Sequence, residues 1–253
     1  MRDLARIVLL AIGTASRRLA NVGIESSLLD AELLMAEAAG VTREAVITGS
    51  INPSSEILYK FETLVARREL REPIAYILGH KEFYSLDFEV TPAVLIPRPE
   101  TEFVVKVALD CVAGKANARV LDIGTGSGAI AIAIAINAPS AQITAVDISP
   151  DALAVASRNA RRHRAEDRVT FRRADCFNIL DDGAALRHYA VSASAAAASR
   201  MRLTRAKIAA AIRMSPSRMS PSRGSRVTID APSMTMRPTT PGPPRPRRRA
   251  GCG

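Results

Sequence analysis

The sequence has few of the residues that build disulfides and metal sites. Among its 253 residues there are only three cysteines and three histidines. Cys111, Cys176 and Cys252 show no paired spacing, and the histidines are scattered. This pattern suits a reducing compartment and argues against a zinc site, so we expect a cytoplasmic protein without a metal centre.

The sequence also lacks a long uninterrupted apolar run. A membrane span needs about 20 consecutive apolar residues, whereas Arg6 interrupts the apolar patch near the N-terminus and Arg17 and Arg18 follow it. We therefore expect no membrane association. The helical spacing of the apolar residues here fits a core-facing helix better than a secretory signal. These residues are Leu4, Val8, Ile12 and Ala15.

Acidic residues are nearly absent from the last quarter of the chain. Residues 1–185 hold 21 Lys and Arg against 24 Asp and Glu, whereas residues 186–253 hold 14 against one, Asp230. The formal net charge of +10 therefore describes neither part. We expect nucleic acid to bind only non-specifically, through this basic tail. A non-catalytic nucleic-acid-binding protein that acts through the tail stays an alternative function.

A glycine-rich turn between two apolar strands is the most informative feature present. The pattern predicts a strand over Ala118 to Ile123, a turn over Gly124 to Gly128, an apolar helix, and a strand from Gln142 to Val146 that ends on Asp147. Glycines let backbone approach a ligand closely, and the helix N-terminus presents free N–H groups to it. An acid at the next strand end can accept hydrogen bonds from ribose hydroxyls. The sequence therefore predicts a site for a nucleoside-bearing cofactor.

The glycine spacing selects among such cofactors. A dinucleotide fingerprint reads G-x-G-x-x-G, which Ser127-Gly128-Ala129 does not provide, so a nicotinamide dehydrogenase is disfavoured. The chain instead reads D-x-G-x-G-x-G, which resembles motif I of S-adenosylmethionine-dependent methyltransferases. A turn that only joins a strand to a helix is the structural alternative. The predicted cofactor-binding residues here are Asp122, Gly124, Thr125, Gly126, Ser127, Gly128 and Asp147.

Residues 1–72 have the pattern of a small helical bundle. Ser27-Leu28-Leu29-Asp30 matches a capping box that opens a helix, and Glu56 to Leu70 is amphipathic, with Ile57, Phe61, Leu64 and Val65 on one face. After Pro73 the stretch YILGHKEFYSLDFEVTP alternates apolar and polar residues, which predicts a two-stranded hairpin. Two prolines then fix an extended segment before a helix that Glu100-Thr101-Glu102 opens.

Two blocks together resemble a known family. The first runs from Arg71-Glu72-Pro73-Ile74-Ala75-Tyr76-Ile77-Leu78-Gly79 through Phe83 to Ile96-Pro97-Arg98-Pro99-Glu100-Thr101-Glu102, and the second is Leu121-Asp122-Ile123-Gly124-Thr125-Gly126-Ser127-Gly128. They resemble the PrmC/HemK family of bacterial and organellar methyltransferases, which modify a glutamine in peptide-chain release factors.

The resemblance implies an α/β fold in three parts. These are an N-terminal helical bundle that docks the substrate (1–72), a β-hairpin linker (73–96), and the N-terminal half of a Rossmann-like S-adenosylmethionine-dependent methyltransferase domain (97–185). The implied methyl donor is S-adenosyl-L-methionine, and the implied partners are class I peptide-chain release factors.

The resemblance also implies an adenine site after the third strand, which the pattern places at Arg168 to Phe171. There Asp175 would lie near the exocyclic amine of adenine. Cys176 would lie against the ring, where the family often has a tryptophan. Without the glycine turn, the residues favour the interpretation of Asp175 as an ordinary strand-terminal or helix-capping aspartate.

The catalytic motif of the family is missing. The resemblance implies Asn-Pro-Pro-Tyr at the end of the fourth strand, where asparagine and a backbone carbonyl orient the acceptor amide nitrogen. The chain reads VSASAAAA over residues 191–198 and contains no Asn-Pro-Pro-Tyr, so the catalytic residues stay unknown. A nucleic-acid adenine methyltransferase, which shares the cofactor fold and the same motif, stays an alternative.

The tail, residues 186–253, has neither apolar periodicity nor the composition to bury a core. It is either a disordered basic tail or, as Arg, Ala, Pro, Gly and Ser dominate it, the product of a reading-frame shift near residue 185. Either origin predicts a sheet truncated after its third strand, with the first strand left at an edge. Ala195–Met214 is the one stretch of the tail where we expect a helix.

Overall fold

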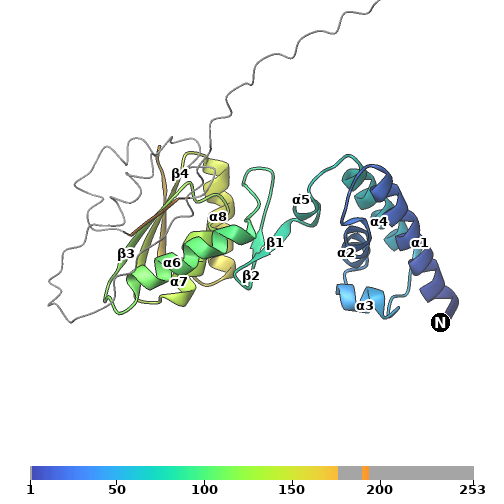
Figure 1. Ribbon diagram of the computed structural model, residues 1–253, viewed down its shortest axis with the longest axis horizontal. Coiled ribbons are helices and arrows are strands. Elements are labelled where there is room, and N and C mark those ends of the chain that lie inside the picture. Colours follow the sequence, from blue (N-terminus) through green and yellow to red (C-terminus); the bar gives the residue numbers. More distant parts are fainter. Residues whose placement is uncertain (1, 176–189, 194–253) are drawn as a thin grey trace, which may run out of the picture. The chain divides into compact units, whose positions relative to one another are not determined.

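The structure is a computed structural model that describes residues 2–175 and 190–193 (Figure 1). In chain order its elements are α1 (Arg2–Asn21), α2 (Ser27–Ala39), α3 (Arg43–Ile47), α4 (Ser55–Glu69), α5 (Ile74–Leu78), β1 (His80–Phe83), β2 (Leu86–Glu89), the 3-10 helix η1 (Pro99–Thr101), α6 (Glu102–Val112), β3 (Arg119–Ile123), α7 (Ala129–Asn137), β4 (Gln142–Asp147), α8 (Pro150–Arg162), β5 (Val169–Arg173) and β6 (Ala190–Ala193). Cys176 and the helix expected over Ala195–Met214 lie outside the described residues.

The helices α1 to α4 share one apolar cluster. Val8, Ile12 and Ala15 of α1 are buried, which confirms the core-facing helix that their spacing predicted. Phe61 and Val65 of α4 are fully buried on the predicted face. In the part of the chain that the structure describes, no helix is long and apolar enough to cross a bilayer.

The capping box expected at the start of α2 is wrong. Ser26, not Ser27, is the N-cap, and its side chain makes no cap bond to the backbone. Asp30 is buried and accepts a hydrogen bond from Arg68 Nε of α4 at 2.7 Å and another from Ser26 Oγ at 2.9 Å. Because a buried carboxylate needs a partner, the pairing of Asp30 with Arg68 explains the acid at this position.

A short helix precedes the hairpin, where the alternation predicted a strand. α5 ends at Leu78, because its C-cap, Gly79, has a φ of 77°, which does not fit a helix. β1 and β2 then pair antiparallel as expected. Tyr84 and Ser85 join them with φ of 53° and 59°, the left-handed conformation of a tight hairpin turn. The buried Phe83 and Phe88 join the core of the following domain, so the hairpin is more than a linker.

Within the described residues, four parallel strands form the main sheet, in the order β5-β4-β3-β6. This order, with the earliest strand inside the sheet, is the expected Rossmann-like arrangement. The expected truncation after the third strand is wrong within the described residues. Residues 120–123 of β3 pair with residues 190–193 of β6, on the side of β3 opposite β4. Sheet pairing uses backbone groups, so the small residues of β6 suffice for it.

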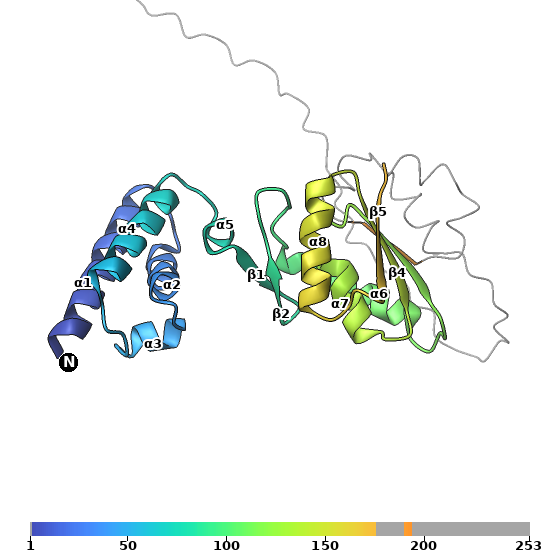
Figure 2. The same ribbon diagram turned by 180° about the vertical axis from the view of Figure 1, so that it is seen from behind.

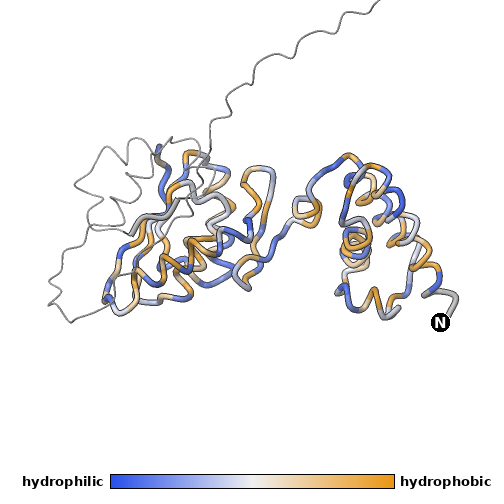
Figure 3. Tube along the Cα trace, in the orientation of Figure 1, coloured by the Kyte–Doolittle hydropathy of each residue, from blue (hydrophilic) through white to orange (hydrophobic). Residues whose placement is uncertain are grey.

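The helices α6, α7 and α8 cover one face of this sheet (Figures 1 and 2). Ala129 to Ala135 of α7 are all buried, as expected of an apolar helix enclosed by a sheet and other helices. Figure 3 shows apolar segments gathered among these strands and helices. The resulting core fixes the carboxyl ends of β3 and β4, where the predicted site lies.

Candidate functional site

The glycine turn is attached to the carboxyl end of β4. The backbone N–H groups of Gly124 and Thr125 both donate to the carbonyl oxygen of Val146, at 2.8 and 3.0 Å. Gly124, Gly126 and Gly128 have φ of 70°, 56° and 80°. Side chains are strained in this region of φ, so the conformation of the turn explains why glycine occupies these positions.

Gly126 and Gly128 differ in what surrounds them. A Cβ atom on Gly126 would meet nothing within 4 Å, so this backbone borders open space. A Cβ atom on Gly128 would lie 3.0 Å from Ile132 Cδ1 and 3.1 Å from Ala156 Cβ, and thus against α7 and α8. Gly126 therefore leaves room for a ligand, whereas Gly128 allows close packing of helices.

Asp147 lies beside this open backbone. Its Oδ2 accepts a hydrogen bond from Gly126 N at 2.9 Å, and its Oδ1 accepts one from Ser149 N at 3.0 Å. A carboxylate has about four lone-pair sites, so each oxygen can accept a further bond. The carboxylate is thereby oriented and can still bind a pair of hydroxyl groups.

Asp122 supports the turn from below. It is completely buried, and its Oδ2 accepts a hydrogen bond from Thr125 Oγ1 at 2.7 Å. Thr125 and Ser127 are also buried. The structure therefore brings together all seven residues predicted in this segment. The bond between Asp122 and the Thr125 hydroxyl is buried, so these two groups stabilise the turn.

β5, the third strand of the main sheet in chain order, ends at the same edge of the sheet. Asp147 pairs in register with Arg173 of β5, and Ala174 N donates to the backbone oxygen of Asp147 at 3.1 Å. Asp175 is half-buried directly after this contact. Cys176, the other residue predicted at the adenine site, lies outside the described residues.

The fourth strand ends beside the turn as well. Ala193 of β6 pairs with Ile123, the residue that precedes Gly124. The place where the family resemblance implies Asn-Pro-Pro-Tyr therefore adjoins the predicted cofactor site. In this chain Ser194, Ala195 and Ala196 follow instead, so the sequence supplies no amide or aromatic side chain there.

Asn159 of α8 is a residue at the site that the sequence reasoning missed. It is completely buried. Its Nδ2 donates to the carbonyl oxygens of Ser127 in the turn and Glu89 in β2, at 2.9 and 3.0 Å. Its Oδ1 accepts from Glu89 N at 2.8 Å. The only sequence signal was a polar residue among alanines on the inner side of an amphipathic helix.

Charged residues of α8 hold the same strand from outside. Arg158 forms an ion pair with Glu89 at 2.7 Å, and the Arg158 guanidinium holds the pKa of the Glu89 carboxyl below its usual value. Arg162 pairs with Asp87, and His163 lies with its ring centroid 5.1 Å from that of Phe88. The hairpin is thus fixed to α8 by buried and exposed contacts together.

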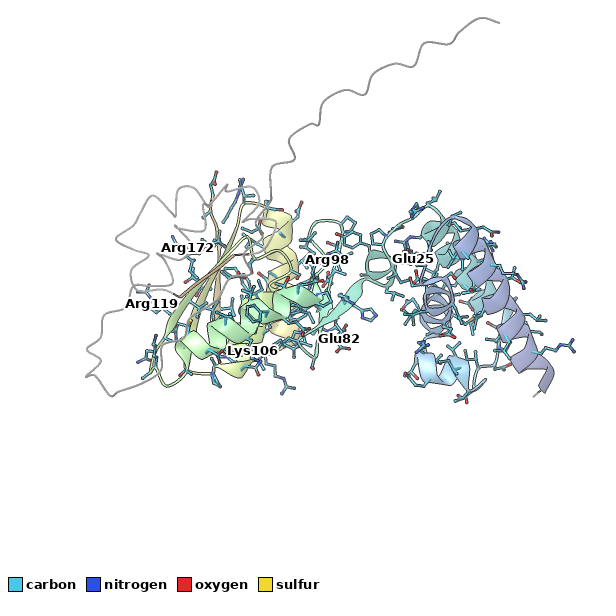
Figure 4. All side chains as sticks on the ribbon, in the orientation of Figure 1. Glu25, Glu82, Arg98, Lys106, Arg119 and Arg172 are labelled. Atoms are coloured by element: carbon cyan, nitrogen blue, oxygen red, sulfur yellow. The ribbon has the colours of Figure 1, made fainter. Side chains whose placement is uncertain are left out.

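The segment between the hairpin and α6 carries the Pro-Arg-Pro block. Val94 is buried against Ala152 and Val155 of α8, and Tyr76 Oη donates to its carbonyl oxygen at 2.7 Å. Arg98 is exposed on this segment (Figure 4).

Within residues 2–175 and 190–193, no group of three or more His, Cys, Asp or Glu side chains could hold a metal ion.

Two protein families match the chain. The PrmC N-terminal domain matches residues 11–79, and a methyltransferase domain matches residues 114–195. Among curated proteins, release factor glutamine methyltransferases are similar. The one from Pseudomonas aeruginosa is 48% identical over 158 residues, covering 62% of this chain and 56% of the relative. The one from Geobacter sulfurreducens is 47% identical over 165 residues, covering 65% of this chain and 57% of the relative.

A third relative, from Burkholderia pseudomallei, is 44% identical over 160 residues, covering 61% of this chain and 56% of its own length. The resemblance seen in the two sequence blocks is therefore confirmed, and the chain carries a methyltransferase domain. The chain spans a little over half the length of these curated relatives.

The two glycines make a matched pair for a stability test. Gly126→Ala should lower the free energy of unfolding by about 1–2 kcal/mol, because only the backbone conformation opposes it. Gly128→Ala should cost about 1–3 kcal/mol more, because its methyl group also crowds Ile132 and Ala156. Urea unfolding of both variants measures the difference. Equal losses would contradict the packing role of Gly128.

Proposed function

We propose that this chain binds S-adenosyl-L-methionine at the carboxyl ends of β3 and β4, in the manner of a release factor glutamine methyltransferase. The contact between Gly126 N and Asp147 Oδ2, 2.9 Å long, carries the proposal. It sets an open stretch of backbone beside a carboxylate with acceptor sites to spare. The two ribose hydroxyls of a nucleoside need such an acceptor.

When bound, the cofactor supplies an electrophilic methyl group on a sulfonium centre. In this proposal Asp147 would accept the hydrogen bonds of the ribose, and the open backbone at Gly126 would border the ligand. From the family resemblance, Asp175 would border the adenine, together with Cys176, which lies outside the described residues. Asp122 holds the turn in place through its bond to Thr125.

The acceptor implied by the resemblance is the side-chain amide of a glutamine in a class I release factor. This nitrogen is a poor nucleophile because its lone pair is delocalised into the carbonyl. Methyl transfer needs no general acid, so catalysis depends mostly on holding this nitrogen in position for attack on the methyl group. We place this acceptor site beside Ala193, which pairs with the end of β3. The missing Asn-Pro-Pro-Tyr leads us to propose that the chain as written binds the cofactor but does not transfer the methyl group.

We further propose that residues 1–72 dock the release factor and that the protein acts in the cytoplasm. Support comes from the PrmC N-terminal domain that matches residues 11–79. The buried cluster of α1 to α4 forms largely within this segment. Ile77 of α5 also contributes to this cluster, so the cluster extends beyond residue 72 toward the hairpin.

Removal of the Asp147 carboxylate tests the cofactor site. Asp147→Ala should weaken the binding of S-adenosylhomocysteine by about 1–3 kcal/mol, because a charge-assisted ribose acceptor is lost. Asp151→Ala, which removes an exposed carboxylate four positions further on, is the control and should bind normally. Calorimetric titration measures both. Equal affinity of the Asp147 variant and the unchanged chain would remove the basis of the assignment.

Deletion of residues 1–72 tests the docking segment. The shortened chain should keep its affinity for S-adenosylhomocysteine, because the turn, Asp147 and the hairpin all remain. Its affinity for a class I release factor should be lost, since docking energy is remote from the chemistry. Calorimetry with each ligand separates the two effects. If cofactor affinity falls as far as release factor affinity, the segment belongs to the cofactor-binding core instead.

A turnover assay tests the role of the missing motif. We expect the 253-residue chain to transfer no labelled methyl group from S-adenosylmethionine to a release factor, whereas a full-length relative does so under the same conditions. Translation of the other two reading frames after codon 185 should yield Asn-Pro-Pro-Tyr if a frame shift made the tail. Turnover comparable to the relative would show that the motif is dispensable.

A further inference from the structure

We propose that Asn159 is a positioning residue that couples the hairpin to the cofactor-binding turn. The inference rests on the proposed function for the identity of the ligand. Asn159 touches neither of the groups assigned to the cofactor, Gly126 and Asp147, in any hydrogen bond. It acts through the backbone of Ser127 on one side and of Glu89 on the other.

The orientation of the Asn159 amide is fixed by its partners. A backbone N–H, that of Glu89, faces one end of the amide, and two carbonyl oxygens face the other. The end that meets the N–H must be Oδ1, and the end that meets the carbonyls must be Nδ2. Both amide protons are therefore used, one on the turn and one on β2, and neither partner can move without affecting the other.

Burial makes these bonds costly to lose. Asn159 has no exposed surface, so a lost partner would leave a polar group without water to replace it. The carbonyl of Ser127 lies in the turn, one residue after Gly126, whose N–H binds Asp147. A shift of Ser127 would therefore disturb the carboxylate that we assign to the ribose.

The hairpin end of this link connects to the segment assigned to docking. Glu89 ends β2, and Val90 N donates to the carbonyl oxygen of Gly79, the residue that follows α5. Ile77 of α5 belongs to the cluster of the N-terminal helices. Because coupling between two binding sites is reciprocal, a change of the hairpin on release factor binding would alter cofactor affinity, and cofactor binding would alter the hairpin.

Two substitutions separate this role from simple packing. Asn159→Ala removes all three bonds and should weaken S-adenosylhomocysteine binding about tenfold at every pH. Asn159→Asp at pH 8 places a carboxylate against two carbonyl oxygens and should bind still more weakly. Burial and these oxygens raise the pKa of the new carboxyl, so at pH 5.5 it becomes protonated and regains a donor. Its affinity relative to the unchanged chain should then recover.

Arg158→Gln is the matched control. It removes the exposed ion pair with Glu89 on the neighbouring residue of α8 and leaves all bonds of Asn159 intact. Its affinity should stay within about twofold of the unchanged chain at both pH values, since exposed ion pairs contribute little. The proposal would be overturned if the S-adenosylhomocysteine affinity of Asn159→Asp, relative to that of the unchanged chain, did not improve at pH 5.5. It would also be overturned if Arg158→Gln bound the ligand as weakly as Asn159→Ala.

Hydrogen exchange of the full chain tests the coupling without depending on these affinities. Addition of S-adenosylhomocysteine should slow exchange at the Glu89 amide, although that amide lies on the hairpin. Without ligand, Asn159→Ala should speed exchange at both Glu89 and Gly126, and Arg158→Gln should leave Gly126 unchanged. If the unchanged chain binds no ligand, the proposed function fails, but this second comparison still decides the link. Faster exchange at Glu89 alone would refute the coupling.

Discussion

The parallel pairing of β3 with β4 is the constraint on which the site depends. In this register Ile123 lies opposite Val146, so the chain that leaves β3 passes the end of β4 at once. The Val146 carbonyl then accepts two turn amides, and Asp147 accepts a third from Gly126. A shift of one residue would turn Asp147 to the opposite face of the sheet and separate it from Gly126.

This pairing also explains why much of the site was predictable from sequence. Glycines at positive φ, an acid at the tip of the next strand and an intervening helix are local signals, each with its own steric or hydrogen-bonding cause. The helix itself carried a conflicting signal. Residues 129–136 are all alanine or isoleucine, and such an uninterrupted apolar run fits a buried strand as well as a buried helix. The glycine turn before this run indicated a helix. Because α7 is buried on all sides, it needs no amphipathic pattern.

The features that sequence did not reveal all depend on contacts between distant segments. Asp30 fits a capping box by spacing, but its partner Arg68 comes from another helix. Asn159 is an ordinary helical position until β2 and the turn are brought to it. β6 has no large apolar side chain to mark it as a strand, because its pairing with β3 relies on backbone groups. Local propensity holds no information on any of these partners.

At β6, the requirements of the fold differ from those of the proposed chemistry. Backbone pairing with β3 asks only that residues 190–193 be extended and small enough to fit, and Ala-Val-Ser-Ala meets that demand. Orientation of an acceptor amide asks for particular side chains directly after the strand, and Ser194-Ala195-Ala196 does not provide them. A sequence can therefore retain the frame of a methyltransferase domain and the glycine turn while it lacks the groups that would position the acceptor. In our proposal, cofactor binding and methyl transfer depend on different strand ends, so loss of the second does not imply loss of the first.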